Sequence, residues 1–423
     1  MIRVVDARMG TGKTSAAIQY MNDHPGKRYL FVTPFIDETK RVQCACPDLH
    51  FWIPNGRLSE YEFRKSSHLR ALVEDGANIA MTHALFKMCD GDVVKMITEK
   101  KYVIFIDEVI DVFTPLAISN SDIKIVTDSG WLKGGGTGEQ TNYEYFEVDA
   151  EKRYQGGLFN DLFVLAKSHR LINISEAGSK NRFYFWALHK ELLALSDEVY
   201  ILTYLFDGMP MKALIEMNHI PYEYIGVAKD DEGAYRFTDT PTADSAPFLK
   251  DLIHICDNDR LNAIGDRDTA LSATWTKSAV SHMDDGRIVR LRRNLNTFFR
   301  NYVPADIKVD GRLWCTFKEA MGKVRDKGFY HSSLAWTSRA TNNYRDRSAL
   351  AYCVNVYLNP NIQNYFAMNG VNIDPDKYAL ANMVQWLWRG CIRSGEEMWV
   401  YIPSRRMRNL LIKWLDQLSK EEM

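Results

Sequence analysis

Residues 2–15 read IRVVDARMGTGKTS, and this stretch decides the fold class. The mostly apolar residues 2–6 predict a short buried strand, residues 7–12 predict a glycine-containing loop, and the residues from Lys13 onward have a helical pattern. A strand, a loop and a helix in this order allow backbone N–H groups and the positive end of the helix dipole to surround phosphate oxygens. The chain is therefore expected to be an α/β protein with a phosphate-binding loop.

The residues of this loop suit a nucleoside triphosphate with a metal ion. Lys13 would reach the β and γ phosphates, and the Thr14 hydroxyl would bind Mg²⁺. The loop departs from the GxxxxGKS/T pattern at its first position, where Ala7 replaces glycine, so we expect a backbone conformation there that an L-residue can adopt. The expected ligands are ATP and Mg²⁺, and the predicted nucleotide-binding residues are Gly10, Thr11, Gly12, Lys13, Thr14 and Ser15.

A second nucleotide element is predicted where an apolar strand runs into two acids, in the sequence YVIFIDE of residues 102–108. Asp107 would hold the metal ion through water, and Glu108 would polarise the water that attacks the γ phosphorus. The alternative is a strand that merely ends in solvated acids. The phosphate-binding loop upstream favours the catalytic interpretation, with Lys13, Asp107 and Glu108 as catalytic residues.

These two elements together resemble the first motor domain of superfamily-two helicases of the DExD/H group, with Asp107-Glu108-Val109-Ile110 in place of DEAD or DEAH. The order of the motifs is most similar to that of the DEAD/DEAH-type helicases of tailed bacteriophages. The resemblance implies two RecA-like P-loop NTPase lobes, each with a central parallel sheet, and a nucleotide cleft between them. Only six residues precede the loop, so the glutamine element that reads adenine in DEAD-box RNA helicases is not expected here.

The boundary between the lobes is predicted at Gly208-Met209-Pro210, where the pattern restarts. The N-terminal lobe is then residues 1–209 and the C-terminal lobe residues 210–423. In the second lobe, strands are predicted over residues 222–227, 312–317, 331–336 and 398–402, and helices over 212–217 and 318–327 and from Pro375. Residues 228–286 show no clean period.

Three strand ends and loops resemble the helicase elements that touch a nucleic-acid backbone. They are the strand ends at residues 33–34 and 82–83 and the polar loop 337–344. The predicted nucleic-acid-binding residues in them are Thr33, Pro34, Thr82, His83, Arg339, Thr341 and Asn342. Thr-Pro and Thr-His at a strand end are also ordinary turn chemistry.

The element that couples ATP state to the lobes has two candidates. A literal Ser-Ala-Thr triplet lies at residues 272–274, far beyond Asp107. The strand over residues 200–206 is better placed to close the first lobe, so Thr203 is preferred as the coupling residue.

A third ATP-site element is expected on the helix that follows Pro375, where Gln385, Arg389 and Arg393 recur at steps of four. This resembles helicase motif VI, although the second arginine of that motif lies seven residues after the glutamine and not eight. At this spacing the three side chains would share one helix face and could neutralise charge on the γ phosphate. The alternative is an amphipathic surface helix with Trp386 or Trp388 in the core.

Charge is balanced over the chain, with 53 Lys and Arg against 54 Asp and Glu among 423 residues, so any nucleic-acid-binding face must be local. Residues 281–350 contain 14 Lys and Arg against 7 Asp and Glu. Arg290 and Arg293 in this basic segment are predicted to contact phosphates. The expected partners are DNA, single-stranded or forked, and replication or recombination proteins, with RNA less favoured.

The compartment is expected to be the cytoplasm, that of the host if a phage encodes the chain. No stretch approaches the roughly 20 apolar residues that cross a bilayer. The seven cysteines lack a second Cys or His pair at zinc-finger spacing and are expected to be reduced thiols.

Two other functions fit parts of the sequence. A DNA-packaging ATPase of the large-terminase kind joins a P-loop motor to a metal-dependent nuclease, and Asp257, Asp259, Asp266 and Asp268 could supply its carboxylates. A nucleotide-dependent DNA-binding or loading module would hydrolyse ATP slowly and separate no strands. A nuclease gives no reason for the arginines after Gln385, so the helicase interpretation is favoured.

Overall fold

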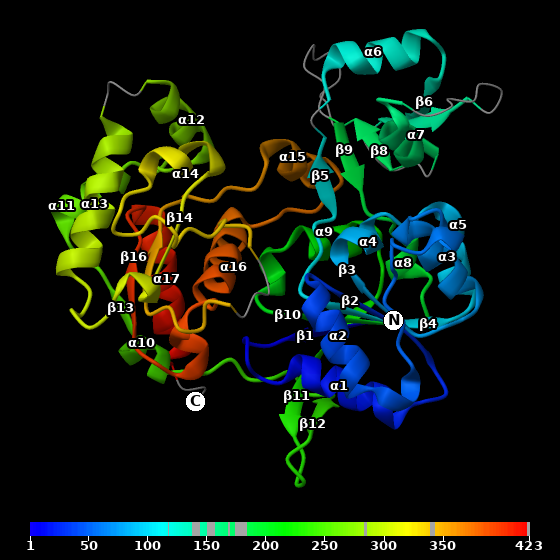
Figure 1. The fold of residues 1–423 in the computed structure, drawn as a ribbon, viewed down its shortest axis with the longest axis horizontal. Helices are drawn as coiled ribbons and strands as arrows, with labels where there is room; N and C mark the ends of the chain where they lie inside the picture. The colour runs from blue at the N-terminus through cyan, green and yellow to red at the C-terminus, as the bar shows by residue number, and fades with distance from the viewer. Residues whose placement is uncertain are drawn as a thin grey trace. The chain divides into compact units, whose positions relative to one another are not determined.

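The computed structural model describes residues 1–116, 118–137, 144–149, 157–167, 170–173, 184–282, 286–338 and 343–420 (Figure 1). The chain divides into two compact units. Unit 1 comprises Met1–Asp6, Gly12–Thr242 and Asn359–Ile373, and unit 2 comprises Ala7–Thr11, Ala243–Leu358 and Asp374–Met423. Each unit is mixed α/β with a parallel sheet, which confirms the predicted fold class.

Unit 1 is built on a seven-stranded sheet in the order β12-β11-β1-β10-β4-β2-β3. Every pair is parallel except β11 with β12. The inner strands are apolar runs and are buried almost throughout, as expected where helices cover both faces of a parallel sheet. The strands are β1 Ile2–Asp6, β2 Arg28–Thr33, β3 Ile79–Thr82, β4 Tyr102–Asp107, β10 Glu198–Thr203, β11 Tyr222–Lys229 and β12 Tyr235–Thr238.

All the helices of unit 1 except α15 lie between strands of this sheet in chain order. Helix α5 begins where the Asp90 carboxylate accepts a hydrogen bond from the N–H of Val93 at 2.9 Å, an N-cap that satisfies one free donor of the first turn. The helices are α1 Lys13–Asp23, α2 Ile36–Ala45, α3 Lys65–Glu74, α4 His83–Lys87, α5 Gly91–Glu99, α8 Glu191–Ala194, α9 Pro210–Met217 and α15 Pro360–Met368.

The strand register aligns the carboxyl ends of five neighbouring strands at one edge of this sheet. Asp6 pairs with Thr203, and Leu202 pairs with Asp107. Thr33 at the end of β2 pairs with Thr82 at the end of β3. The segments that follow these strands therefore start from one edge, the edge at which open parallel sheets bind their ligands.

A small antiparallel sheet is inserted into unit 1 between β4 and β10, in the order β5-β9-β8-β7-β6 (Figure 1). It has its own apolar core, which includes Val126, Phe146, Leu171 and Tyr184. No element was predicted here. The insert consists of β5 Phe113–Pro115, α6 Asn120–Asp128, β6 Leu132–Thr137, β7 Glu144–Val148, α7 Asn160–Lys167, β8 Leu171–Asn173 and β9 Tyr184–Ala187.

Unit 2 contains a four-stranded parallel sheet in the order β13-β16-β15-β14. Its strands are β13 Ile253–Ile255, β14 Arg312–Cys315, β15 Ala349–Tyr352 and β16 Met398–Tyr401. Its helices are α10 Phe248–Leu252, α11 Asp259–Asn262, α12 Ala273–Ser281, α13 Arg287–Asn301, α14 Lys318–Val324, α16 Pro375–Leu387 and α17 Arg405–Leu418. Apolar residues from α13, α14 and three of the strands form one core.

Two features of the predicted organisation differ in the structure. The division between the units follows Thr242 and not residue 209, because β11 pairs with β1 and completes the first sheet. The strand predicted over residues 331–336 is wrong, since only an isolated bridge joins Ser333 to Trp314. The strand beside β14 is β15.

Membrane-spanning helices and disulfides are two further features to examine. No helix in the part of the chain that the structure describes is long and apolar enough to cross a membrane. All seven cysteines are free, and only Cys44 is exposed.

Candidate functional site

The predicted phosphate-binding loop has the backbone that its sequence requires. The backbone angle φ is +90° at Gly10 and +94° at Gly12, a region that L-residues rarely adopt, whereas Ala7 has no positive φ. The Thr11 hydroxyl donates a hydrogen bond to the carbonyl of Arg8 at 2.8 Å and closes the turn. Alanine at the first motif position is therefore compatible with this loop, as predicted.

The loop leads into α1, and the first turn of this helix meets the end of β4. The Thr14 hydroxyl donates to Oδ1 of Asp107 at 3.3 Å. Burial raises the pKa of Asp107 to about 7, and the charges of Glu108 and Glu38 add to this effect, while Lys13 and the Thr14 hydroxyl oppose it. The structure thus brings together the predicted residues of both nucleotide elements.

This oxygen-rich corner suits a divalent cation. Thr14 and Asp107 offer the hard oxygen ligands that Mg²⁺ prefers, and the nearby carboxylates leave negative charge for a cation to neutralise. Over the described ranges there is no group of three or more His, Cys, Asp or Glu that could hold a metal ion. Mg²⁺ is usually held by one or two protein ligands, with phosphates and water completing the shell.

Glu108 occupies a strained position just after β4. Its φ is +64°, a left-handed conformation that costs an L-residue roughly 1–2 kcal/mol. The Glu108 N–H donates to the carbonyl of Leu202 at 2.9 Å, which anchors the turn to β10. Strained backbone of this kind is concentrated at functional sites, and here it turns the chain out of the sheet directly after Asp107.

Asp6 is a site residue that the sequence analysis missed. Its Oδ2 accepts a hydrogen bond from the N–H of Phe206 at 3.0 Å. Burial raises the pKa of Asp6, while backbone hydrogen bonds at Phe206 and Leu205 and the charge of Lys13 oppose the rise. Asp6 thus links the start of the loop to the chain that follows Thr203. Its place at the carboxyl end of a strand was the available signal.

Thr203, the preferred coupling residue, lies at this same edge. It pairs with Asp6 in the sheet and is 1% exposed. Within the described ranges its hydroxyl has no hydrogen-bond partner. The Ser272-Ala273-Thr274 triplet instead begins α12, where the Ser272 hydroxyl caps the helix by accepting from the N–H of Trp275 at 3.2 Å.

The two strand ends predicted to touch nucleic acid belong to β2 and β3, which lie on one side of β4 in the sheet. The side chain of Thr33 is fully buried and is not available to a surface ligand, while Pro34 beside it is half-buried. Thr82 caps α4 by accepting from the N–H of Leu85 at 3.4 Å. The Nε2 atom of His83 lies 2.9 Å from the carbonyl oxygen of Asp107. His83, which follows β3, therefore contacts the end of β4 beyond the intervening strand β2, whereas Thr82 caps α4.

The predicted arginine-finger helix is shorter than expected. Helix α16 ends at Leu387, and a separate 3₁₀ helix, Cys391–Ser394, follows. The prediction that Gln385, Arg389 and Arg393 share one helix face is therefore wrong.

The backbone packs closely just after the end of α16. The N–H of Cys391 donates to the carbonyl of Arg347 at 2.8 Å, and a β-carbon at Gly390 would lie 2.8 Å from the same oxygen. Gln385 and Arg389 are 2% and 3% exposed, whereas Arg393 is exposed. Trp386 and Trp388 are both buried, which confirms the core role considered for them.

The basic segment forms the strongly amphipathic helix α13. Its buried face includes Ile288, Leu291, Leu295 and Phe298. Arg290, Arg293 and Arg300 are exposed, and no ion pair to them is found in the described parts of the chain.

Arg287 begins the same helix, but its side chain contacts other residues of unit 2. Arg287 donates to the Ser278 hydroxyl at 3.0 Å and stacks on Trp275, so this arginine is used inside the unit. Arg339, Thr341 and Asn342 lie outside the residues that the structure describes.

The carboxylates of the nuclease alternative are not gathered into a metal site. Asp257, Asp259, Asp266 and Asp268 are exposed. Asp268 forms an ion pair with Arg405 at 3.1 Å. All four residues lie within the described ranges, in which no metal-binding group of three is found.

Comparison with known proteins places the chain in a family. The YonV C-terminal Rossmann-like domain matches residues 248–415. The SPbeta prophage-derived uncharacterized protein YonV of Bacillus subtilis (strain 168) is 34% identical over 420 residues, which cover 98% of each chain. The chain belongs to the YonV family.

Solved helicase structures are also similar to this YonV-family chain. A structure named XPD helicase is 13% identical with a TM-score of 0.48, and the similarity covers 99% of this chain and 94% of that one. The S. tokodaii Xpd4 structure is 12% identical with a TM-score of 0.45, and covers 100% and 94% of the two chains. Both scores lie below 0.5.

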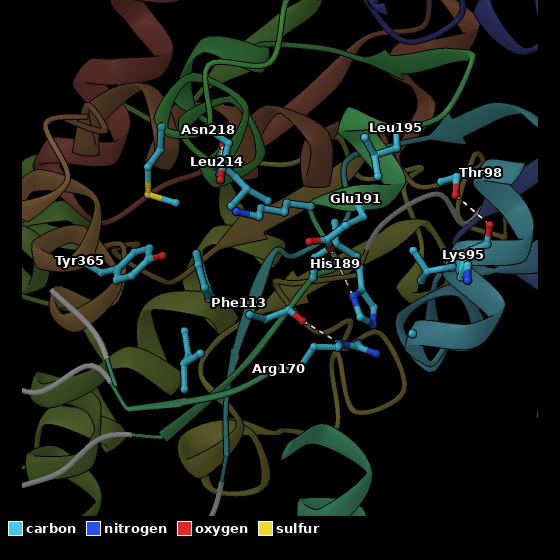
Figure 2. A pocket seen from close by; sticks show the side chains of 17 residues that line it. Lys95, Thr98, Phe113, Arg170, His189, Glu191, Leu195, Leu214, Asn218 and Tyr365 are labelled. Carbon is cyan, nitrogen blue, oxygen red and sulfur yellow. Dashed lines mark hydrogen bonds and ion pairs between the residues drawn. The ribbon is translucent and has the colours of Figure 1, made fainter. Parts of the chain in front are cut away.

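Unit 1 of the YonV-family chain also contains a cavity of about 590 Å³ at the base of the insert (Figure 2). Residues of β5, β8 and β9 line it together with residues of α5, α8, α9 and α15, and none belongs to the predicted site. Phe113, Leu214 and Tyr365 contribute buried apolar walls. His189 is buried, and its Nε2 atom has no hydrogen-bond partner in the described ranges.

Arg170 beside this cavity joins the insert to α4. Its guanidinium donates to the carbonyls of Ala187 at 2.9 Å and of Cys89 at 2.6 Å, and also to the carbonyl of Lys87. The last two carbonyls lie at the C-terminal end of α4, where carbonyls lack helical partners. Burial lowers the pKa of Arg170 to about 10. Arg170 therefore acts as a cationic cap on the helix that begins with His83.

Proposed function

We propose that this chain is an ATP-hydrolysing motor that moves along or unwinds nucleic acid. The contact between the Thr14 hydroxyl and Asp107 supports this proposal most strongly, because it joins the phosphate-binding loop to the acidic end of β4. A chance GKT sequence gives no reason for a carboxylate at this position. The positive φ values at Gly10 and Gly12 add a backbone suited to phosphate oxygens.

The residues of this corner would divide the chemistry of hydrolysis. Lys13 would bind the β and γ phosphates, and Glu108 would orient and polarise the attacking water. Thr14 and Asp107 would hold Mg²⁺, which when bound neutralises charge on the phosphate oxygens. Asp6 would keep the loop in register with the chain after Thr203, so that a change at the phosphates reaches that segment.

Unit 2 would supply the remaining contacts of the motor. Arg389 and Arg393 follow α16 in unit 2 and would act on the γ phosphate as arginine fingers. The exposed arginines of α13 would bind the phosphates of a single strand. The relative YonV is named as prophage-derived. We extend the proposal to phage DNA replication or recombination, with RNA the less favoured substrate.

Hydrolysis in the presence of different nucleic acids tests this function. We expect ATP turnover that needs Mg²⁺ and is stimulated by single-stranded DNA more than by duplex DNA or RNA. Strand displacement on a forked duplex would follow the same ATP dependence. ATP turnover without stimulation or strand displacement would instead support the loading module, and absence of turnover would contradict the proposal.

A further inference from the structure

The hairpin of β11 and β12 brings an aromatic side chain against the phosphate-binding loop. Strand β11 pairs in parallel with β1, the strand that leads into the loop, and β12 returns antiparallel to β11. A β-carbon built on Gly12 would lie 2.1 Å from Cδ1 and 2.2 Å from Cε1 of Tyr235. The Tyr235 ring is therefore in direct contact with Gly12, the residue before Lys13.

The hairpin is fixed relative to α1 by side chains on both sides of Tyr235. Arg236 forms an ion pair at 2.6 Å with Asp23, the last residue of α1. The Phe237 ring stacks on Tyr200 of β10, with the centroids 5.2 Å apart. The position of Tyr235 beside the loop is thus determined by packing and charge.

Tyr235 is not needed to complete the hydrophobic core at this edge of the sheet. Ile225 and Val227 of β11 supply the buried apolar side chains of the hairpin, whereas Tyr235 is half-buried. The amine of the exposed Lys229 lies over the Tyr235 ring, with Nζ 5.1 Å from the ring centroid. A half-buried aromatic ring at the phosphate-binding loop, with a positive charge beside it, suits a ligand that joins a planar base to an anionic chain.

We propose that Tyr235 stacks on the base of the nucleotide whose phosphates the loop binds. This inference rests on the proposed function, since it requires a nucleotide at Lys13 and Thr14. Stacking on an aromatic ring tolerates every nucleobase, because each base has a π face. Tyr235 therefore contributes affinity for ATP, GTP, CTP and UTP alike and contributes nothing to a ligand without a base.

Calorimetric binding of two probes to the full chain tests this role. The probes are a non-hydrolysable ATP analogue and inorganic tripolyphosphate, both with Mg²⁺. Tyr235→Ala is expected to weaken binding of the analogue about ten-fold, in the range found for loss of one stacked base, and to leave tripolyphosphate binding unchanged. Tyr235→Phe should bind as the wild type does, and Tyr235→Leu, which keeps bulk without a π face, should resemble Tyr235→Ala.

The matched control is Tyr330→Ala, which removes an exposed tyrosine from unit 2 and should change neither affinity. Equal weakening of both probes by Tyr235→Leu would overturn the inference, because the ring would then only support the loop. Unchanged or tighter binding of the analogue would also overturn it, and tighter binding would mean that the ring blocks the site. A wild-type chain that binds neither probe would contradict the proposed function itself.

Discussion

Single residues of the proposed ATP site, which comprises Lys13, Thr14, Asp107 and Glu108, have separate tasks in the proposed function, so their loss should produce separate defects. Lys13→Ala removes the charge that meets the phosphates and is expected to weaken nucleotide binding at least about ten-fold, with turnover falling in parallel. Glu108→Gln keeps the shape of the side chain and should bind ATP normally while kcat falls by about 10²–10⁴. Calorimetry and a phosphate-release assay measure the two quantities. Normal turnover in either variant would remove that residue from the site.

Glu198 at the start of β10 should make the free energy of unfolding depend on pH, independently of the proposed ATP site. Burial would raise its pKa, but hydrogen bonds from Lys27, Tyr200 and Tyr20 outweigh burial and hold the pKa at about 2. A carboxylate with a lowered pKa stabilises the folded state above its unfolded pKa of about 4.3, and this stabilisation is lost as the pH falls towards 2.

Glu198→Gln should therefore lower the free energy of unfolding by roughly 1–3 kcal/mol at pH 7. The difference from the wild type should shrink between about pH 4.5 and pH 2, as the wild-type carboxylate becomes protonated. Denaturant titrations at pH 7, 5 and 3 follow this change. Glu223→Gln, at a carboxylate that is 46% exposed, is the control and should have a smaller effect. A difference that stays constant with pH would contradict the assigned cause.

Among the elements, α13 carries the prediction for nucleic-acid binding. Each cation that neutralises a phosphate on a single strand contributes about −0.7 to the slope of log affinity against log salt. Removing Arg290 and Arg293 together should therefore flatten this slope by about one unit or more and leave base preference unchanged. Salt titrations of fluorescent single-stranded DNA measure the slope.

A paired control separates α13 from a general loss of charge. The double variant Arg57→Ala and Lys65→Ala also removes two exposed cations, but from unit 1. It should leave the salt slope unchanged. An equal change in both double variants would mean that α13 is not the binding face.

The end of α16 separates two arginines by their burial. Arg389 is 3% exposed, so Arg389→Ala should lower the melting temperature as well as kcat. Arg393 is exposed, so Arg393→Ala should leave the melting temperature unchanged and lower kcat without weakening ATP binding. Thermal unfolding and steady-state kinetics on both variants make the comparison. An unchanged kcat in Arg393→Ala would exclude it as an arginine finger.

For the whole molecule, the insert and the proposed ATP site are joined through Arg170, α4 and His83. Arg170→Met should leave the carbonyls at the end of α4 without their donor and lower the free energy of unfolding by about 1–3 kcal/mol. Because His83 contacts the carbonyl of Asp107, ATP turnover should fall as well. Lys167→Met, an exposed change in the same insert, should affect neither measurement. Normal turnover in a destabilised Arg170→Met would show that the insert does not act on the site.

The sequence could predict the parts of the molecule that depend on local pattern. The loop and α1 follow from residues 2–15, and β4 follows from an apolar run that ends at Asp107. The contact between Thr14 and Asp107 was also predictable, because carboxyl ends of parallel strands meet at one edge.

Long-range pairing accounts for what the sequence could not predict. β11 joins β1 across about 220 residues, and no local pattern encodes this pairing, so the unit boundary and the contact of Tyr235 with Gly12 were missed. The insert has strands of three to six residues, too short for a clear alternation of apolar and polar residues. The early end of α16 depends on the Arg347 carbonyl, which is distant in sequence.

Residues 359–373 return to unit 1, and this limits how the protein can be divided into stable fragments. Phe113 of β5 packs on Tyr365 and Phe366 of α15, with ring centroids 4.9 Å and 5.5 Å apart. A fragment cut after Thr242 would lack α15 and leave this aromatic surface bare, so it should aggregate even though its main sheet is complete. The two halves are therefore not interchangeable modules, and a viable chimaera would have to carry α15 from the same parent as the insert.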